Sequence, residues 1–177
     1  MLKNEITYKQ ASSDDELRQI LALQQENHRD DLSIEIQKKE GFITLRHDFE
    51  TLKQMNDACG HIIAKDGFKV VGYALSMTRY FRDDIPLLIP MFQKIEKALP
   101  STDYLVMGQV CIDRQYRGKG IFRDLYKYMR AALSKDFEML ITEVNKKNTR
   151  SLNAHKAIGF EILSTSDDWL VIAWDWK

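Results

Sequence analysis

The segment that constrains the fold most is residues 104–133, where an apolar stretch meets a glycine-containing turn and then an amphipathic stretch. Residues 104–112 are mostly apolar, which predicts a buried strand. From Ile121 to Leu133, apolar residues recur at helical spacing with charges between them, which predicts a helix. Residues 137–144 predict another strand. This half of the chain is therefore expected to form a strand–helix–strand crossover in a protein of mixed α and β structure.

The turn between this strand and this helix predicts an anion-binding site. The first amides of a helix have no partner within the helix and lie at the positive end of its dipole. Gly118 and Gly120 would let an anion approach the backbone, and Arg114, Arg117 and Lys119 add positive charge. The alternative is an ordinary turn with solvated basic residues, which a pair of glycines alone would favour.

Two common phosphate-binding motifs do not fit this turn. Neither Ser nor Thr follows Gly118-Lys119, as a P-loop requires, and no third glycine completes the dinucleotide fingerprint GxGxxG. A different phosphate-containing ligand is therefore indicated.

The rest of the chain also alternates between helical and strand patterns. A capping box at Ser13–Glu16 predicts the start of the first helix. The expected helices are at about 13–28, 47–59, 85–99 and 148–159, and the other expected strands are at 61–65, 69–79 and 169–176, with a hairpin turn at Asp66-Gly67 and a polar turn at 164–168. Because no repeat or linker interrupts this order, residues 1–177 are expected to form a single domain.

Composition and charge limit the classes of protein that this chain can represent. Of its 177 residues, 44% are hydrophobic and 29% are charged, which suits one globular domain. Lys plus Arg and Asp plus Glu each number 26, so no charge excess favours nucleic acid or an anionic membrane surface. We therefore expect neither nucleic acid nor a membrane as a partner.

The cellular location and metal content are also predicted from composition. The N-terminus, MLKNEITYKQ, lacks the apolar core of a signal peptide, and no apolar run reaches the length of a membrane span, so a cytoplasmic protein is expected. Cys59 and Cys111 are too few for a disulfide framework and should be reduced thiols. The four histidines show no metal-ligand spacing, so no metal is expected.

Two motifs in a defined order resemble one family. Gln115-x-x-Gly118-x-Gly120 fits the Gln/Arg-x-x-Gly-x-Gly/Ala signature of the GNAT (GCN5-related) N-acetyltransferase superfamily. Residues 144–160, with Asn148, Ser151, His155 and a final Gly-Phe pair, look like a later motif of that family. Residues 70–75 resemble its third strand, whereas the first 60 residues carry little of the resemblance.

The resemblance implies an α/β (α+β) GNAT fold, with a mixed, strongly twisted sheet of about six to seven strands flanked by helices. Its fourth and fifth strands would splay apart and open a slot for coenzyme A (CoA). Backbone groups near Val110 and Ile112 would pair with the pantetheine arm, and an amide of that strand would polarise the thioester carbonyl. The residues implied in cofactor binding are Val110, Cys111, Ile112, Gln115, Tyr116, Arg117, Gly118, Lys119, Gly120, Ile121, Phe122, Asn148 and Ser151.

Catalytic roles follow less directly from the resemblance. His155 occupies the position where many members carry a tyrosine that protonates the departing sulfur, and it would need to be an imidazolium to do so. A packed core histidine is the alternative, because His155 should point inward from its helix. Glu143 is a candidate general base, directly or through water, with Asp113 and Glu50 as alternatives. Cys111 could carry an acyl-cysteine intermediate, but no histidine lies close to it in sequence, so a packing role is expected.

The function that the resemblance implies is transfer of an acetyl group from acetyl-CoA, a cosubstrate, to the amine of a small molecule or peptide. The amine would attack directly in a ternary complex. The alternatives are a non-catalytic CoA-binding module, and an acyltransferase with a longer acyl donor or a protein N-terminus as acceptor. Asp30, Asp31, Asp167 and Asp168 are candidates for attracting a cationic amine. The protein is expected to be a monomer or homodimer.

Overall fold

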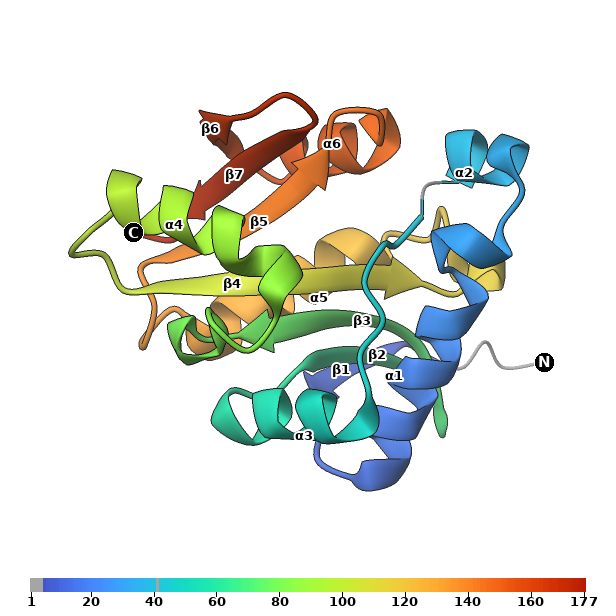
Figure 1. Cartoon of the computed structure of the whole chain (residues 1–177). Helices are drawn as coiled ribbons and strands as arrows, with labels where there is room; N and C mark the ends of the chain where they lie inside the picture. Colours follow the sequence, from blue (N-terminus) through green and yellow to red (C-terminus); the bar gives the residue numbers. More distant parts are fainter. Residues whose placement is uncertain (1–4, 41) are drawn as a thin grey trace.

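A mixed sheet organises the molecule. The computed structural model describes residues 5–40 and 42–177, in which seven strands follow the order β1-β2-β3-β4-β5-β7-β6 (Figure 1). The strands are β1 (Thr7–Gln10), β2 (Ile62–Asp66), β3 (Lys69–Met77), β4 (Tyr104–Ile112), β5 (Met139–Asn145), β6 (Glu161–Thr165) and β7 (Trp169–Asp175). Only β4 and β5 pair in parallel; the other neighbours are antiparallel. The predicted α+β class is confirmed.

Helices cover both faces of this sheet. They are α1 (Asp14–Glu26), α2 (Ile34–Glu40), α3 (Phe49–Ala58), α4 (Ile89–Ala98), α5 (Ile121–Leu133) and α6 (Thr149–Lys156). Buried side chains of α1, α3 and α4 share one hydrophobic cluster, and those of α5 form the other cluster with residues from the opposite face of the strands. In Figure 1, α5 accordingly lies behind the sheet and α1, α3 and α4 lie in front.

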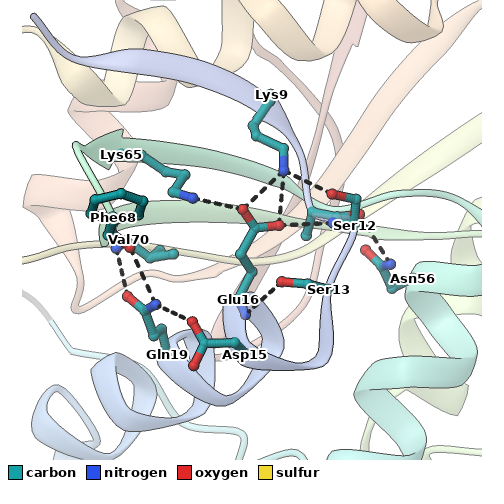
Figure 2. Close-up of polar contacts among 11 residues, drawn as sticks. Lys9, Ser12, Ser13, Asp15, Glu16, Gln19, Asn56, Lys65, Phe68 and Val70 are labelled. Carbon is teal, nitrogen blue, oxygen red and sulfur yellow. Dashed lines mark hydrogen bonds and ion pairs between the residues drawn. The ribbon is translucent and has the colours of Figure 1, made fainter.

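The predicted capping box begins α1, but its glutamate accepts the backbone amide of Ser12 instead of that of the capping residue Ser13. The Ser13 hydroxyl accepts a hydrogen bond from the Glu16 amide at 3.2 Å, but the Glu16 carboxylate accepts the amide of Ser12 at 2.9 Å (Figure 2). Burial would raise the pKa of Glu16, but hydrogen bonds from Lys65 and Lys9 outweigh burial and lower it to about 2. The carboxylate thus fastens α1 to both β1 and β2.

The fourth and fifth strands of the sheet splay apart, as the family resemblance implied. They pair at only three positions, from Tyr104↔Met139 to Val106↔Ile141, although β4 continues to Ile112 and β5 to Asn145. Where the backbone pairing ends, the Thr142 hydroxyl donates to the Met107 carbonyl at 2.9 Å. Beyond this point the two strands leave a slot between them.

Two edge strands were missing from the sequence-based prediction. β1 (TYKQ) has no apolar alternation, and β6 (EILST) is largely exposed, so neither has the pattern of a half-buried strand. The predicted turn at 164–168 was therefore wrong at its start, because Ser164 and Thr165 pair with Val171 and Leu170. The helix predicted at 85–99 also begins later: Pro86–Leu88 form a 3-10 turn before α4.

Residues 5–40 and 42–177 contain neither a membrane-spanning helix nor a cluster of metal ligands. None of the helices there combines the length and apolar character that a membrane span needs. Nor do those residues contain a group of three or more His, Cys, Asp or Glu side chains arranged to hold a metal ion. Residues 1–4 of the N-terminal sequence used in the signal-peptide prediction lie outside the described residues.

The buried histidines predict that the fold loses stability in mild acid. Burial lowers the pKa values of His47, His61 and His155 to about 4, whereas an unfolded histidine titrates near 6.5. The contribution of these neutral histidines to the free energy of unfolding is complete above pH 6.5. It is lost as the pH falls toward 4, by up to about 1.4 kcal/mol per pH unit for each histidine. The raised pKa of Glu143 acts in the opposite direction.

Urea unfolding at pH 7.5, 6 and 5 measures this effect, and the unfolding free energy should fall steeply below pH 6.5. A His61→Phe variant should show a shallower slope, because it removes one of the titrating groups. An unfolding free energy that stays constant from pH 7.5 to 5 would contradict the prediction.

Candidate functional site

Two connected cavities occupy the slot between β4 and β5. The first encloses about 370 Å³ between the end of β4, the start of α5, and α6. The second encloses about 330 Å³ between β4, β5 and the start of α4. The residues that line both are Phe42, Ile43, Val110, Asn148 and Ser151. The cavities are therefore two ends of one slot.

The glycine turn forms the end wall of the first cavity. Gly118 and Gly120 have φ values of +75° and +84°, which glycine adopts more readily than other residues. A β carbon at Gly118 would meet no atom of the described residues within 4 Å, so open space lies against the backbone. In the part of the chain that the structure describes, no side chain caps the N-terminus of α5, whose first residues also line the cavity. This combination of open backbone and uncapped amides suits a phosphate group.

The basic side chains of the turn brace it. Arg117 donates to the Ile112 carbonyl at 3.0 Å and to Asn27 Oδ1 at 2.6 Å, which joins the turn to the ends of β4 and α1. The Lys119 ammonium lies 4.6 Å from the centre of the Tyr116 ring. Arg117 also lines the first cavity, so its positive charge is close to any anion bound there.

Most of the residues implied in cofactor binding line the first cavity. They are Val110, Cys111, Ile112, Tyr116, Arg117, Gly118, Gly120, Ile121, Phe122, Asn148 and Ser151. Gln115 and Lys119 are not part of this wall. Arg123 and Arg150, which sequence reasoning missed, do belong to it and add positive charge. In the sequence, only one feature pointed to these two arginines, namely that each lies in the first turn of a predicted helix.

The segment between α2 and α3 was also missed. It crosses β4 in Figure 1, and its residues Phe42 and Ile43 line both cavities. Asn148 caps α6 by accepting the Ser151 amide at 3.2 Å, and its side-chain amide donates to the Phe42 carbonyl at 3.5 Å. No motif marks this segment, so its position depends on these tertiary contacts.

A buried polar network holds the same segment against β4. Gln109 Oε1 accepts hydrogen bonds from Gln24 at 2.9 Å and from the Tyr73 hydroxyl at 2.6 Å, while its amide donates to the Leu45 carbonyl at 2.8 Å. Gln24 in turn accepts the His47 backbone amide at 2.8 Å. Gln24, Tyr73 and Leu45 lie on three different elements, so the network positions the wall of the second cavity.

His155 is fully buried at the floor of the second cavity. Its Nδ1 lies 2.7 Å from the Ser151 carbonyl, which can only accept, so we assign the ring proton to Nδ1. Nε2 then accepts from the Tyr126 hydroxyl at 2.6 Å. Burial lowers the pKa of His155 to about 4, so the ring is uncharged at neutral pH. An acid role would require an imidazolium that this environment disfavours.

Among the carboxylates considered as a base, Glu143 lies on the wall of the second cavity. Burial raises its pKa, and Lys94, whose Nζ is 3.7 Å from the carboxylate, partly offsets this effect. Asp113 instead accepts Lys69 at 2.6 Å; burial would raise its pKa, but Lys69 and the Gln115 amide together outweigh burial and lower it. Glu50 lies in the first turn of α3 and lines neither cavity.

The remaining chemical candidates are placed less favourably. Cys111 lines the first cavity, but burial raises the pKa of its thiol to about 12, which leaves it protonated and a poor nucleophile. The aspartate pairs at 30–31 and 167–168 do not line either cavity. Asp31 accepts Arg46 at 2.7 Å, so its charge is already paired.

Comparison with known proteins identifies relatives of this arrangement. A family model described as "Acetyltransferase (GNAT) family" matches residues 17–160. No curated protein sequence gives a significant match.

Solved structures match over nearly the whole chain. PH1933 from Pyrococcus horikoshii OT3 is 18% identical, covers 97% of this chain and 98% of its own, and has a TM-score of 0.66. The ribosomal-protein-S18-alanine N-acetyltransferase of Escherichia coli is 14% identical over 97% of this chain and 94% of its own, with a TM-score of 0.64. The putative acetyltransferase yncA of Salmonella typhimurium, solved with its cofactor acetyl-CoA, is 12% identical over 98% and 95%, with a TM-score of 0.66. At these identities the similarity establishes the fold.

Proposed function

The chain belongs to the acetyltransferase (GNAT) family, and we propose that it transfers an acetyl group from acetyl-CoA to a primary amine within a ternary complex. One observation carries this proposal: a single slot connects the open glycine turn at Gly118 and Gly120 to the partly buried carboxylate of Glu143. The turn suits the phosphates of a cosubstrate, and the carboxylate suits an amine. The acetyl-CoA bound to the Salmonella typhimurium neighbour supports the choice of cosubstrate.

The residues of the first cavity fit CoA in charge and shape. The uncapped α5 amides and Arg117 would hold its pyrophosphate, and the exposed backbone of β4 beyond Val106 would pair with the pantetheine arm. When bound, acetyl-CoA supplies the thioester. A backbone amide of the Val110–Ile112 stretch would donate to the developing negative charge on the carbonyl oxygen.

Glu143 has the central chemical role in this proposal. A primary amine enters the second cavity as an ammonium ion, and the Glu143 carboxylate accepts one of its protons. The freed lone pair then forms the C–N bond to the thioester carbonyl carbon, and the C–S bond breaks to release the thiolate. The nitrogen loses a second proton as the amide forms, and the thiolate gains one. The net products are an amide, CoA thiol and one released proton.

His155 has a positioning role in the same proposal. As a neutral ring bonded to Ser151 and Tyr126, it would hold α6 against α5 and so set the width of the slot. The sulfur can leave without a protein acid, because a free thiol has a pKa of about 8.5 and its thiolate is a tolerable leaving group.

CoA binding provides the first test. Because a ligand that binds only the folded state stabilises it, CoA at about 100 times its dissociation constant should raise the unfolding free energy by about 3 kcal/mol and Tm by roughly 5–10 °C. Thermal shift with millimolar CoA measures this, with glutathione as the control thiol. The absence of a shift in folded protein would refute the proposal, and a shift without thiol release from acetyl-CoA on any amine would indicate a non-catalytic module.

A further inference from the structure

We propose that the acceptor is a small primary amine whose remaining body is apolar and uncharged, and that this body fills the second cavity. The inference rests on the proposed acetyl transfer and specifies its substrate class. It excludes polyamines, amino acids and peptide N-termini as preferred acceptors. The argument comes from the charges, the satisfied polar groups and the apolar surface of the cavity wall.

The charge of the wall matches one ammonium ion. Of the described residues that line the second cavity, Glu143 and Lys94 carry charge, and they lie 3.7 Å apart. Lys94 also donates to the Ser166 hydroxyl at 3.0 Å. Among the described residues of this wall, a second ammonium group on the ligand would find no second carboxylate. A ligand carboxylate would have to compete with Glu143 for Lys94.

Three polar side chains of the wall already have partners within the protein. Gln109 is bonded to Gln24, Tyr73 and Leu45, and Thr142 donates to the Met107 carbonyl. Both ring nitrogens of His155 are also bonded. A polar ligand group placed against these three side chains would have to displace their bonds or stay unpaired, and both options disfavour binding.

The rest of the wall provides apolar contact. Leu88, Pro90 and Met91 approach from the start of α4, Phe42 and Leu45 from the segment between α2 and α3, and Trp169 from β7. Their enclosed volume of about 330 Å³ suits a small molecule. Each methylene of the acceptor that enters this space should raise kcat/KM by roughly threefold.

The test uses amines that differ in one feature at a time. In the series from propylamine to hexylamine, which share nearly the same pKa, kcat/KM for CoA release should rise by roughly threefold per methylene until the cavity is full. Hexylamine should exceed cadaverine, its isostere with a terminal ammonium, by at least about tenfold. Pentylamine should exceed norleucine, which adds only a carboxylate, by a similar factor. Thermal shift by each amine in the presence of CoA gives a second readout that does not depend on turnover.

A variant at the cavity rim tests the charge argument. Leu87 lines the cavity but is 62% exposed, so Leu87→Glu should fold and place a second carboxylate at the mouth. The ratio of cadaverine to hexylamine turnover should rise by about tenfold. The matched control is Phe68→Glu at the tip of the β2–β3 hairpin, where the side chain is 94% exposed, and its ratio should not change.

The outcomes separate this inference from the proposed function. A preference for cadaverine over hexylamine, or for norleucine over pentylamine, would overturn the acceptor class and leave acetyl transfer intact. If no amine is acetylated, an alkylamine shift that grows with chain length in the presence of CoA would support the acceptor class, and its absence would overturn it. Failure to bind CoA would overturn both proposals.

Discussion

Glu143→Gln should lower kcat/KM for hexylamine on the order of 10³-fold at pH 7. Without a carboxylate to accept the proton, only the neutral amine can react. A primary amine with a pKa near 10.4 is neutral in roughly one molecule per thousand or fewer at that pH. The wild-type protein avoids this limit because Glu143 is on the cavity wall and can deprotonate the bound ammonium ion.

The pH dependence distinguishes this role from a structural one. Burial raises the pKa of Glu143, so wild-type activity should rise as the pH increases through that value and then level off. The kcat/KM of the variant should instead rise about tenfold for each pH unit until the amine itself loses its proton. The ratio of wild-type to variant kcat/KM should therefore shrink to about tenfold near pH 9. A deficit that stays constant with pH would show that Glu143 shapes the site without transferring a proton.

Two further variants serve as controls for the pH profiles. Glu50→Gln removes a carboxylate that lines neither cavity and should leave the profile unchanged. His155→Phe should lower Tm, because it leaves the buried Tyr126 hydroxyl without its partner. The pH profile of this variant should keep the shape of the wild-type profile, because a neutral His155 supplies no acid whose titration would make activity fall with rising pH. Loss of a falling limb at neutral pH would identify His155 as the acid that its position in the motif suggested.

The parts of the site that could be predicted from sequence are those that neighbouring residues determine. The glycine turn, the helix that follows it and the Asn148 cap each depend on a few consecutive residues. The inward orientation of His155 follows from helical spacing, and its burial is confirmed. The splayed strands came from the family resemblance, since no local pattern encodes where two strands stop pairing.

The parts that could not be predicted depend on contacts between distant residues. Gln109 reaches Gln24, which is 85 positions away, and through Leu45 it places a segment that has no motif of its own. The raised pKa of Glu143 likewise depends on burial by other elements and on Lys94 from α4. The acceptor cavity is built from such contacts, which explains why the substrate class could be proposed only once the wall was visible.

Gly118→Val should raise the KM for acetyl-CoA between about 10- and 100-fold, the effect of losing one hydrogen bond to a charged group. Space next to the Gly118 backbone is open, so the valine side chain would occupy the position that a phosphate needs. Turnover at saturating acetyl-CoA should change little, because Gly118 belongs to the first cavity and Glu143 to the second.

The same substitution also strains the backbone, and Gly67→Val provides the matched control for that effect. Gly67 lies in the β2–β3 hairpin turn with a φ of +58°, close to the +75° of Gly118. Both variants should lose about 1–2 kcal/mol of unfolding free energy, because a β carbon disfavours a left-handed backbone. Only Gly118→Val should also weaken the binding of acetyl-CoA and so raise its KM. Steady-state kinetics with varied acetyl-CoA, together with urea unfolding of both variants, measures the two effects. Equal losses of stability with an unchanged KM in both would place the phosphates away from the glycine turn.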